Sequence, residues 1–414
     1  MIREAIILAG GLGTRLREKV PDLPKCMAPV AGEPFLVHVI RHLLSQGIER
    51  FIFSLGYKHE LIESFLASDF AYLDYTCVLE DEPLGTGGAI RKACGQAHES
   101  QVLVVNGDTL FRVDLPSLYA FHCSVHAICT LALKPMVEFD RYGLVIANEQ
   151  GVIERFAEKN YYPSGLINGG VYLLDRLALL GQPFPEKFSF EKDYLEKQTG
   201  RGRLYGQSQN GYFIDIGIPS DYEKAQEDLK HLAPDLNVVD KRWTLFLDRD
   251  GVINHDKVGS YIFNAGEFRF YPGLPGDFRK LSERFGHIIV VTNQRGVGRG
   301  LMSESDLSGI HEKMLKEVAD AGGRIDAIYY CTATENNDPR RKPYPGMALQ
   351  AKKDFPSIDF SKSIIVGNNI SDMRFGRNAG IYTVFVTTTQ AKKEPPHPEI
   401  DLQFPLLTDF VRSL

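Results

Sequence analysis

Short apolar runs alternate with amphipathic stretches along the N-terminal half of the chain. AIILA (5–9), FIFSL (51–55) and VLVVN (102–106) are almost wholly apolar, which predicts strands buried on both faces. The apolar period of FLVHVIRHLLSQG (35–47) and GAIRKACGQA (88–97) predicts helices, the first ending at a glycine suited to a C-cap. This alternation predicts an α/β domain with a mostly parallel sheet, in which ligands gather beyond the carboxyl ends of the strands.

The alternation is interrupted once and then resumes. The stretch APDLNVVDKR (233–242) has no regular apolar period, and we interpret it as a linker. A chain of 414 residues is too long for one ordinary core, so two domains are expected, over 1–232 and 243–414. The second is again an open, doubly wound α/β domain, because apolar runs typical of strands return at 244–248, 286–293, 325–331, 363–368 and 382–386.

Composition excludes several classes of partner. The formal charge is −6 and no block of like charges occurs, which argues against nucleic acid and against an anionic membrane. No segment approaches the ~18 consecutive apolar residues of a membrane helix, and the apolar start of the chain is too short for a signal peptide. The six cysteines show no CxxC and no metal-ligand spacing, so we expect free thiols and a cytoplasmic protein. Nothing in the sequence sets the oligomeric state.

The first predicted strand leads into a loop suited to phosphate. GGLGTRL (10–16) lets backbone N–H groups approach a polyphosphate closely, and its arginine adds a bidentate cation. By spacing alone, a plain glycine-rich turn fits about as well. Lys25, a second glycine-rich loop at 81–89 and Asp108 at a strand end each have an ordinary structural interpretation too. Together they supply the amides, cations and carboxylates of a phosphoryl-type transfer with Mg²⁺.

A series of motifs covering nearly all of residues 1–230 resembles the sugar-1-phosphate nucleotidyltransferase family. In order they are GGLGTRL, PKCMAPV, LGTGGA, NGDT, FAEKN, INGGVYLL and FIDIGIPSDY. The forms DRYG, INGGVYLL, EKFSFEK and YFIDIGIP are similar to those of the D-glycero-α-D-manno-heptose 1-phosphate guanylyltransferases, although mannose-1-phosphate guanylyltransferases share much of them. The resemblance implies a GT-A-like fold and in-line attack of a sugar phosphate on the α-phosphorus of a nucleoside triphosphate.

The resemblance also assigns roles to individual residues. It implies that Asp108 and Asp215 hold Mg²⁺, with Arg15 and Lys25 as the catalytic cations. Lys159 would meet the phosphate of the sugar, and Gly143, Glu158 and Asn168 the sugar itself. The implied nucleotide site consists of Leu8, Ala9, Gly10, Gly11, Gly13, Thr14, Arg15, Lys25, Glu80, Gly85, Thr86 and Asn106. For the base we hypothesise that Glu80 accepts from guanine N1–H and N2–H, which adenine cannot reproduce.

The second half opens on LFLDRDGVIN (245–254), where an apolar strand delivers two aspartates. A strand followed by a polar turn would explain the spacing, but Asp248 and Asp250 at such a strand end need a partner or a metal. Thr292 follows another predicted strand, Lys342 lies in RRKPYPGM, and VGNNISD closes a further strand with an acidic end. A nucleophilic carboxylate, a second carboxylate, a hydroxyl, a lysine and a metal-binding end are the parts of a phosphatase.

These four motifs resemble the haloacid dehalogenase superfamily, in particular its heptose bisphosphate and histidinol-phosphate phosphatase branch, over about residues 243–390. The resemblance implies that Asp248 forms an aspartyl-phosphate and that Asp250 serves as acid and base. It further implies that Thr292 and Lys342 bind the phosphoryl oxygens with support from Asn293, and that Arg341 grips the far phosphate. The implied Mg²⁺ ligands are Asp248, the Asp250 backbone carbonyl, Asn368 and Asp372.

The second half departs from this family pattern at two places. Asn368 stands where an acidic residue is usual, which should weaken Mg²⁺ binding unless Asp372 compensates. The stretch before RKP offers only Cys331, so we predict no zinc. The gaps between motifs are too short for a large cap domain, and small loops such as GSYIFNAGEFRF (259–270) must screen the site instead.

The leading hypothesis is a bifunctional enzyme that uses Mg²⁺ in both domains, GTP and heptose phosphates. The C-terminal domain would remove the 7-phosphate from heptose 1,7-bisphosphate, and the N-terminal domain would transfer GMP to the resulting heptose 1-phosphate. Two alternatives remain open. The second half could be a non-catalytic module that binds sugar phosphates, or the pair of substrates could be mannose 1-phosphate and histidinol phosphate.

Overall fold

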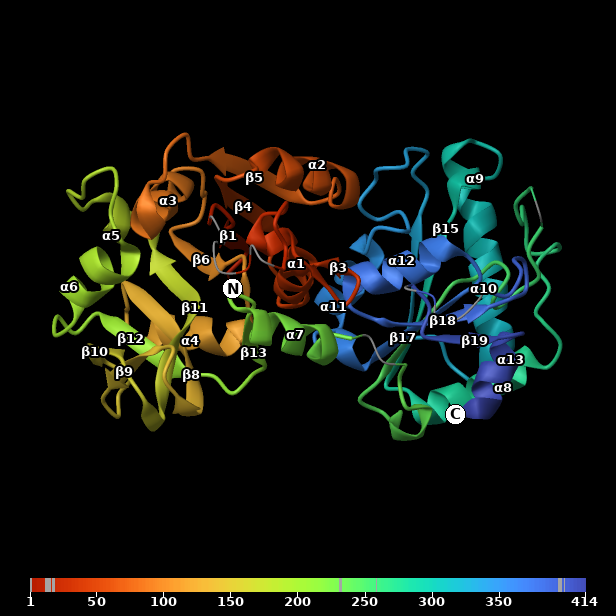
Figure 1. Cartoon of the computed structure of the whole chain (residues 1–414). Coiled ribbons are helices and arrows are strands. Elements are labelled where there is room, and N and C mark those ends of the chain that lie inside the picture. Colours follow the sequence, from red (N-terminus) through yellow and green to blue (C-terminus); the bar gives the residue numbers. More distant parts are fainter. Residues whose placement is uncertain are drawn as a thin grey trace. The chain divides into compact units, whose positions relative to one another are not determined.

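The computed structural model describes residues 2–11, 16, 19–230, 233–257, 259–393, 397 and 399–414. The chain separates into two compact units, residues 1–230 and 231–414, each with its own sheet (Figure 1). Within the described ranges, no helix combines the length and the apolar character needed to cross a membrane. All six cysteines fall inside these ranges and are free thiols.

Nine strands in the described part of the first unit form one mixed sheet. Its order is β10-β9-β11-β6-β1-β4-β5, and β8 joins both β11 and β12. Neighbours from β6 to β5 are parallel, whereas β11 runs antiparallel to β6, β8 and β9. The strands are β1 (Glu4–Leu8), β4 (Arg50–Leu55), β5 (Asp74–Leu79), β6 (Gln101–Asn106), β8 (Cys129–Phe139), β9 (Gly143–Ala147), β10 (Ile153–Lys159), β11 (Tyr162–Asp175) and β12 (Leu204–Ser208).

Helices and two short ribbons complete the first unit. The helical segments are α1 (Phe35–Ser45), α2 (His59–Asp69), α3 (Gly85–Cys94), α4 (Leu115–Ser124), α5 (Arg176–Leu180), the π-helical η3 (Phe190–Leu195), α6 (Glu196–Gln198), α7 (Pro219–Asp228) and the short 3-10 turn η2 (Lys25–Met27). The ribbons pair β2 (Pro29–Val30) with β3 (Glu33–Pro34), and β7 (Thr109–Phe111) with β13 (Phe213–Asp215). The second ribbon is important for the site because it places Asp215 opposite Thr109.

The continuous apolar runs of the first half are the central strands of its sheet. Ile6 pairs with Ile52 on one side and with Val104 on the other, and all three side chains are fully buried. The predicted strands and helices at the start of the chain are confirmed. The antiparallel strands from residue 129 to 175 were not predicted, because polar and glycine residues interrupt their apolar pattern.

The second unit is built on a sheet that is entirely parallel among its described strands, in the order β16-β15-β14-β17-β18-β19. The strands are β14 (Thr244–Leu247), β15 (His287–Asn293), β16 (Ala327–Cys331), β17 (Ser363–Gly367), β18 (Tyr382–Val386) and β19 (Leu402–Phe404). The helices are α8 (Leu274–Arg284), α9 (Arg295–Gly298), α10 (Glu304–Asp320), α11 (Gly346–Asp354), α12 (Ile370–Ala379) and α13 (Leu407–Ser413), with 3-10 turns η4 (Leu236–Val238) and η5 (Phe360–Lys362).

The strands of this second sheet bury both of their faces. Leu245 and Leu247 belong to a core shared with α8, α10 and α13, whereas Phe246 belongs to a separate core shared with α11 and α12. Successive side chains of a strand point to opposite faces, so helices cover the sheet on both sides and the doubly wound prediction is confirmed. Among the described residues, only loops and isolated bridges lie between β14 and α8, as expected without a large cap.

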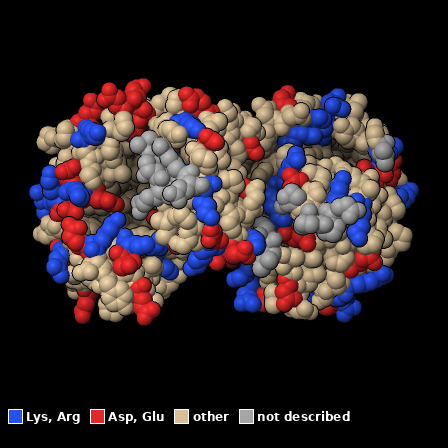
Figure 2. All heavy atoms as spheres, in the orientation of Figure 1, with Lys and Arg blue, Asp and Glu red and all other residues tan. Residues whose placement is uncertain are grey.

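Two further sequence predictions concern the linker and the surface. In the predicted linker, Val239 is buried, as is Trp243 just beyond it, and both side chains join the core of the second unit, while Leu236 O accepts from Arg284. Figure 2 shows basic and acidic side chains intermingled over the visible face of each unit, in keeping with the balanced composition.

Candidate active sites

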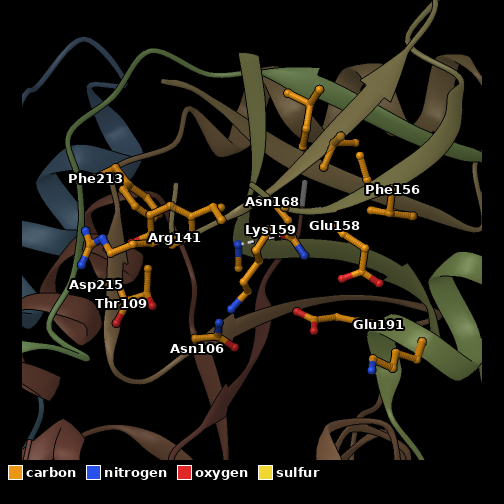
Figure 3. A pocket seen from close by; sticks show the side chains of 18 of the residues that line it. Asn106, Thr109, Arg141, Phe156, Glu158, Lys159, Asn168, Glu191, Phe213 and Asp215 are labelled. Carbon is orange, nitrogen blue, oxygen red and sulfur yellow. Dashed lines mark hydrogen bonds between the residues drawn. The ribbon is translucent and has the colours of Figure 1, made fainter. Parts of the chain in front are cut away.

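The first unit holds a cavity of about 600 Å³ beside the carboxyl end of its central strands. The cavity is lined by Gly143, Glu158, Lys159 and Asn168, the four residues that the family resemblance assigns to the sugar and its phosphate. In Figure 3, Lys159 and Asn168 lie near the middle of the cavity, with Glu158 and Glu191 on one side and Asp215 on the other. Other lining residues that were not predicted are Thr109, Arg141, Tyr142, Glu191, Lys192 and Glu196. The motif EKFSFEK was the available signal for Glu191 and Lys192.

Asn168 is held in one orientation within this cavity. Its Nδ2 donates to the Tyr172 hydroxyl (2.9 Å), and its Oδ1 accepts from the backbone N–H of Gly170 (3.0 Å). Burial raises the pKa of Tyr172, so the phenol stays neutral. The amide is therefore fixed by its own strand and can present a constant edge to a ligand.

At one side of the cavity, Lys25 joins two carboxylates from different parts of the chain. Its Nζ lies 2.6 Å from Asp108 Oδ2 and 3.0 Å from Asp215 Oδ1. Burial opposes the charge on Lys25, but the carboxylates of Asp108 and Asp215 outweigh it and raise its pKa. Asp108 follows β6 and Asp215 ends β13, so the structure places side by side the two aspartates that the resemblance pairs, and adds Lys25 between them.

The predicted nucleotide loop is described in part. Gly13, Thr14 and Arg15 lie outside the described residues, whereas Leu8 ends β1 and Ala9 donates its N–H to Ser54 O. Gly10 lies so close to Glu80 that an added Cβ would come within 2.8 Å of its Oε1. Glu80 accepts from Leu84 N (3.1 Å) and from Ser54 Oγ (3.3 Å). Glu80 thus lies against the glycine loop, and Gly11 is exposed beside it.

The second glycine-rich loop begins α3 and contacts the segment that leads into η3. Gly85 has φ +70°, and a Cβ there would come within 2.7 Å of Phe188 O, so only glycine fits. Thr86 Oγ1 accepts from Phe190 N over 3.0 Å. Asn106 ends β6 and lines the cavity. The predicted nucleotide residues at 85 and 86 are therefore linked to the same segment that carries Glu191.

In the second unit, Lys342 joins Asp248 and Asp372. Its Nζ lies 2.7 Å from Asp248 Oδ1 and 2.7 Å from Asp372 Oδ1, and it also donates to Val291 O. Burial raises the pKa of Asp248 to about 7, although Lys342 opposes this shift. Asp248 follows β14, and Asp372 lies in the first turn of α12. The parallel sheet brings these strand ends to one edge, as the sequence predicted.

The Asp250 carboxylate accepts hydrogen bonds from residues other than those that contact Asp248. Arg249, with no exposed surface, donates to both of its carboxylate oxygens, and Asn254 and Gln294 donate as well. Burial would raise the pKa of Asp250, but Arg249 outweighs it and lowers the pKa. The Asp250 side chain is thereby held by donors from three residues. Sequence reasoning missed Arg249 and Gln294, although both flank quoted motif residues.

The remaining predicted residues surround this centre. Thr292 is 1% exposed and accepts from Gln294 Nε2. Both ends of the Asn293 amide contact the backbone of Lys342, which gives Asn293 a supporting position. Asn368 Nδ2 donates to Thr389 Oγ1 over 2.8 Å, so Oδ1 is the atom able to coordinate a cation. Arg341 is half-buried next to Lys342.

Both sites have the donors that Mg²⁺ prefers. The ion takes oxygen ligands and needs only one or two carboxylates when substrate phosphates complete its shell. Asp108 with Asp215, and Asp248 with Asp372, each supply two carboxylates around a shared lysine, so these residues fit the ion. Within the described ranges, no group of three His, Cys, Asp or Glu side chains is arranged to hold a metal.

The two folds and their lysine–carboxylate centres define a two-part enzyme of phosphoryl chemistry. The family model for nucleotidyl transferase matches residues 4–231, and that for polynucleotide kinase 3 phosphatase matches residues 245–409. The chain belongs to the nucleotidyl transferase family, and its C-terminal half is a phosphatase-family domain.

Three relatives illustrate the likeness. The D-glycero-alpha-D-manno-heptose 1-phosphate guanylyltransferase of Aneurinibacillus thermoaerophilus is 50% identical over 228 residues, which cover 55% of this chain and 99% of that protein. The crystal structure of HddC from Yersinia pseudotuberculosis complexed with GMP-PN is 37% identical, has a TM-score of 0.51, and covers 55% of this chain and 100% of that one. The structure of D,D-heptose 1.7-bisphosphate phosphatase from B. bronchiseptica, complexed with magnesium and phosphate, covers 41% of this chain and 96% of that one, at 28% identity and a TM-score of 0.38.

Proposed function

We propose that the chain is a bifunctional enzyme of GDP-heptose biosynthesis. The proposal that the sugar is a heptose and the base is guanine is supported by the 50% identity to a heptose 1-phosphate guanylyltransferase over 99% of the length of that protein. The cavity of the first unit supports this role, because its carboxylates, amide and lysine suit a hydroxylated sugar that carries a phosphate. The expected compartment is the cytoplasm.

In the guanylyl transfer, the phosphate oxygen of heptose 1-phosphate attacks the α-phosphorus of GTP in line, and pyrophosphate leaves. Lys159 orients the attacking phosphate, while Glu158 and Asn168 accept from and donate to the sugar hydroxyls. Lys25 carries positive charge beside Asp108 and Asp215, where the triphosphate would approach. Mg²⁺ held by these carboxylates would neutralise phosphate charge. The rate enhancement comes from the positioning of the two reactants and from neutralisation of phosphate charge, without a covalent intermediate.

In the phosphatase reaction, an oxygen of Asp248 attacks the phosphorus of the 7-phosphate and forms an aspartyl-phosphate. Asp250 takes up a proton from solvent, against the effect of Arg249 on its pKa, and gives it to the leaving sugar oxygen; the resulting carboxylate then takes a proton from the attacking water. Lys342 holds Asp248 in place and offers its ammonium to the phosphoryl oxygens, beside the Thr292 hydroxyl. Mg²⁺ would add positive charge at this centre. The product, heptose 1-phosphate, is the nucleophile of the first unit.

The test is to incubate the protein with heptose 1,7-bisphosphate, Mg²⁺ and either GTP or ATP, and to identify products by mass. GDP-heptose, pyrophosphate and inorganic phosphate are expected with GTP. The Asp248→Asn variant should accept only pre-formed heptose 1-phosphate, while the exposed Asp320→Asn serves as a matched control. If Asp248→Asn consumed the bisphosphate at the full rate, the assignment of Asp248 as the nucleophile would be wrong. If the protein reacted with mannose 1-phosphate in preference to heptose 1-phosphate, the proposed sugar substrate would be wrong.

A further inference from the structure

Arg249 separates the two aspartates of the phosphatase motif in the chain, and its side chain lies against the second of them. Arg249 Nε lies 3.1 Å from Asp250 Oδ1, and Arg249 Nη2 lies 3.0 Å and 2.8 Å from the two carboxylate oxygens. The Arg249 side chain has no exposed surface, whereas the Asp250 side chain is 25% exposed. The guanidinium is therefore out of reach of a substrate, while part of the carboxylate stays accessible.

The remaining nitrogen of Arg249 is held by a histidine from a distant helix. Arg249 Nη1 lies 3.2 Å from Nε2 of His311, which belongs to α10. The residues Leu307, Ile310 and Met314 follow the helical period and enter the core of the second unit, so α10 is fixed against the sheet. His311 lies on this same buried face, at a position where an apolar side chain is usual.

His311 is present as the neutral imidazole. Burial and the charge of Arg249 lower the pKa of His311 to about 4. One nitrogen of a neutral ring is an acceptor, and Nε2 has this role because a guanidinium can only donate. All three nitrogens of Arg249 thus have partners, two facing Asp250 and one facing His311. A long side chain with many rotamers is thereby fixed in one of them.

We propose that His311 is a positioning residue of the phosphatase and that it acts on Asp250 through Arg249. By fixing the guanidinium, His311 fixes the direction in which the Asp250 carboxyl group faces the leaving oxygen. Proton transfer depends on this direction, because donor and acceptor must lie within hydrogen-bond reach. The inference rests on the proposed phosphatase function, in which Asp250 serves as acid and base. His311 itself does not touch the substrate.

The two chemical steps need the Asp250 carboxyl group in different ways. In the first step Asp248 attacks phosphorus, and the bond from phosphorus to the leaving oxygen breaks. The leaving oxygen keeps the electron pair of that bond, and a sugar oxygen must also take the proton of Asp250, whereas p-nitrophenolate leaves as the anion. In the second step Asp250 takes a proton from the water that attacks the aspartyl-phosphate, whichever group has left. A misplaced Asp250 therefore slows the first step for a sugar phosphate alone, and the second step for both substrates.

The test is the pre-steady-state hydrolysis of p-nitrophenyl phosphate by His311→Phe, which keeps an aromatic ring and removes the acceptor. We expect a burst of about one p-nitrophenolate per active site, followed by turnover about 10- to 100-fold slower than in the wild type. This is part of the ~10²- to 10⁴-fold that acid–base catalysis contributes, because Asn254 and Gln294 still hold Asp250. With heptose 1,7-bisphosphate, kcat should fall at least as much, without a burst and with little change in KM. His311→Gln should recover most of the rate, because its amide oxygen can accept from Arg249.

A double variant tests whether His311 acts through Arg249. Arg249→Met should show the same burst and slow turnover, and adding His311→Phe to it should lower kcat little further, since residues that act as one unit are not additive. The matched control is His287→Phe, which should behave as the wild type. His287 begins β15 and contacts Ser357, whereas the phosphatase centre lies at the other end of that strand.

The positioning role and the phosphatase function fail in different ways. If His311→Phe melts at a lower temperature but turns over both substrates at the wild-type rate per folded molecule, His311 only stabilises the core and the inference is wrong. Additive losses in the double variant would also contradict it. A wild type that hydrolyses p-nitrophenyl phosphate but not heptose 1,7-bisphosphate would overturn the proposed substrate, while the burst in His311→Phe would still support the positioning role. A wild type inactive on both would overturn the phosphatase function and the inference together.

Discussion

Lys342 Nζ lies 2.7 Å from Asp248 Oδ1, which joins the end of β14 to a loop 94 residues later in the sequence. The same ammonium contacts Asp372, so one cation holds two carboxylates that would otherwise repel each other. The first unit repeats this arrangement independently, with Lys25 between Asp108 and Asp215. In each of the two units, a lysine thus holds two carboxylates close together at the place where a phosphate is expected to bind.

Removing the ammonium of Lys342 should destabilise the second unit as well as abolish its activity. In Lys342→Met, Asp248 and the buried Asp372 face each other without a cation, and breaking a buried ion pair costs about 3–5 kcal/mol. Thermal unfolding measures the loss, and Mg²⁺ should recover part of it by replacing the positive charge. Lys316→Met, which removes an exposed lysine paired with Asp320, should leave the melting temperature close to that of the wild type, because solvent screens an exposed ion pair. Equal melting temperatures for both variants would contradict this account.

Asn368→Asp should lower the Mg²⁺ concentration that half-saturates phosphatase activity by about tenfold, because ligand charge tunes affinity for the ion. Activity measured over a Mg²⁺ titration gives the value. Thr389→Val should act in the opposite direction, since the Asn368 amide loses the acceptor that fixes its orientation. A wild type that stays silent at saturating Mg²⁺, and is rescued by Asn368→Asp, would instead favour the non-catalytic module.

Glu80→Gln should reduce the preference for GTP over ATP by about tenfold, because an amide can accept only one of the two guanine N–H groups. Competition between the two nucleotides in one reaction measures the ratio directly. Glu82→Gln, an exposed change on the same loop, is the control. If the ratio is the same in both variants, Glu80 serves only to hold the loop through Leu84 N and Ser54 Oγ.

The first unit should lose stability in mild acid through His122. This histidine is 2% exposed between Thr130 and Gln101, and burial lowers its pKa to about 4. In the unfolded chain, His122 binds a proton near pH 6.5, so the neutral buried histidine makes its full contribution to folding stability above that pH. This contribution is lost as the pH falls towards 4, and the total loss is about 3 kcal/mol.

Melting temperatures across this pH window, in wild type and in His122→Gln, provide the measurement. The glutamine does not titrate, so the difference between the two proteins should shrink as pH falls. His126→Asn is the control, because His126 is exposed and its φ of +50° suits asparagine. Parallel curves for wild type and His122→Gln would show that His122 does not carry the effect.

Much of the central fold could be predicted because its strands are buried on both faces. In LFLDRDGVIN, Leu245 and Leu247 enter one core and Phe246 the other, and a continuous apolar run is the only pattern compatible with this arrangement. The antiparallel strands β8 to β11 lack such a run, so their pairing depends on contacts far apart in the sequence. That region lines the cavity of the first unit, and its residues were predicted from motifs rather than from strands.

The sequence by itself predicted which residues carry chemistry, since a carboxylate such as Asp248 at the end of a fully apolar strand needs a partner or a metal. It could assign Asp248, Asp250, Thr292 and Lys342 to one phosphatase centre. Only the tertiary structure decided their partners: that Arg249 donates to Asp250, and that the Asn293 side chain contacts the Lys342 backbone. Those contacts join residues of different loops. The order of the loops along the chain does not say which of them are close in space, because packing of the sheet and helices decides it.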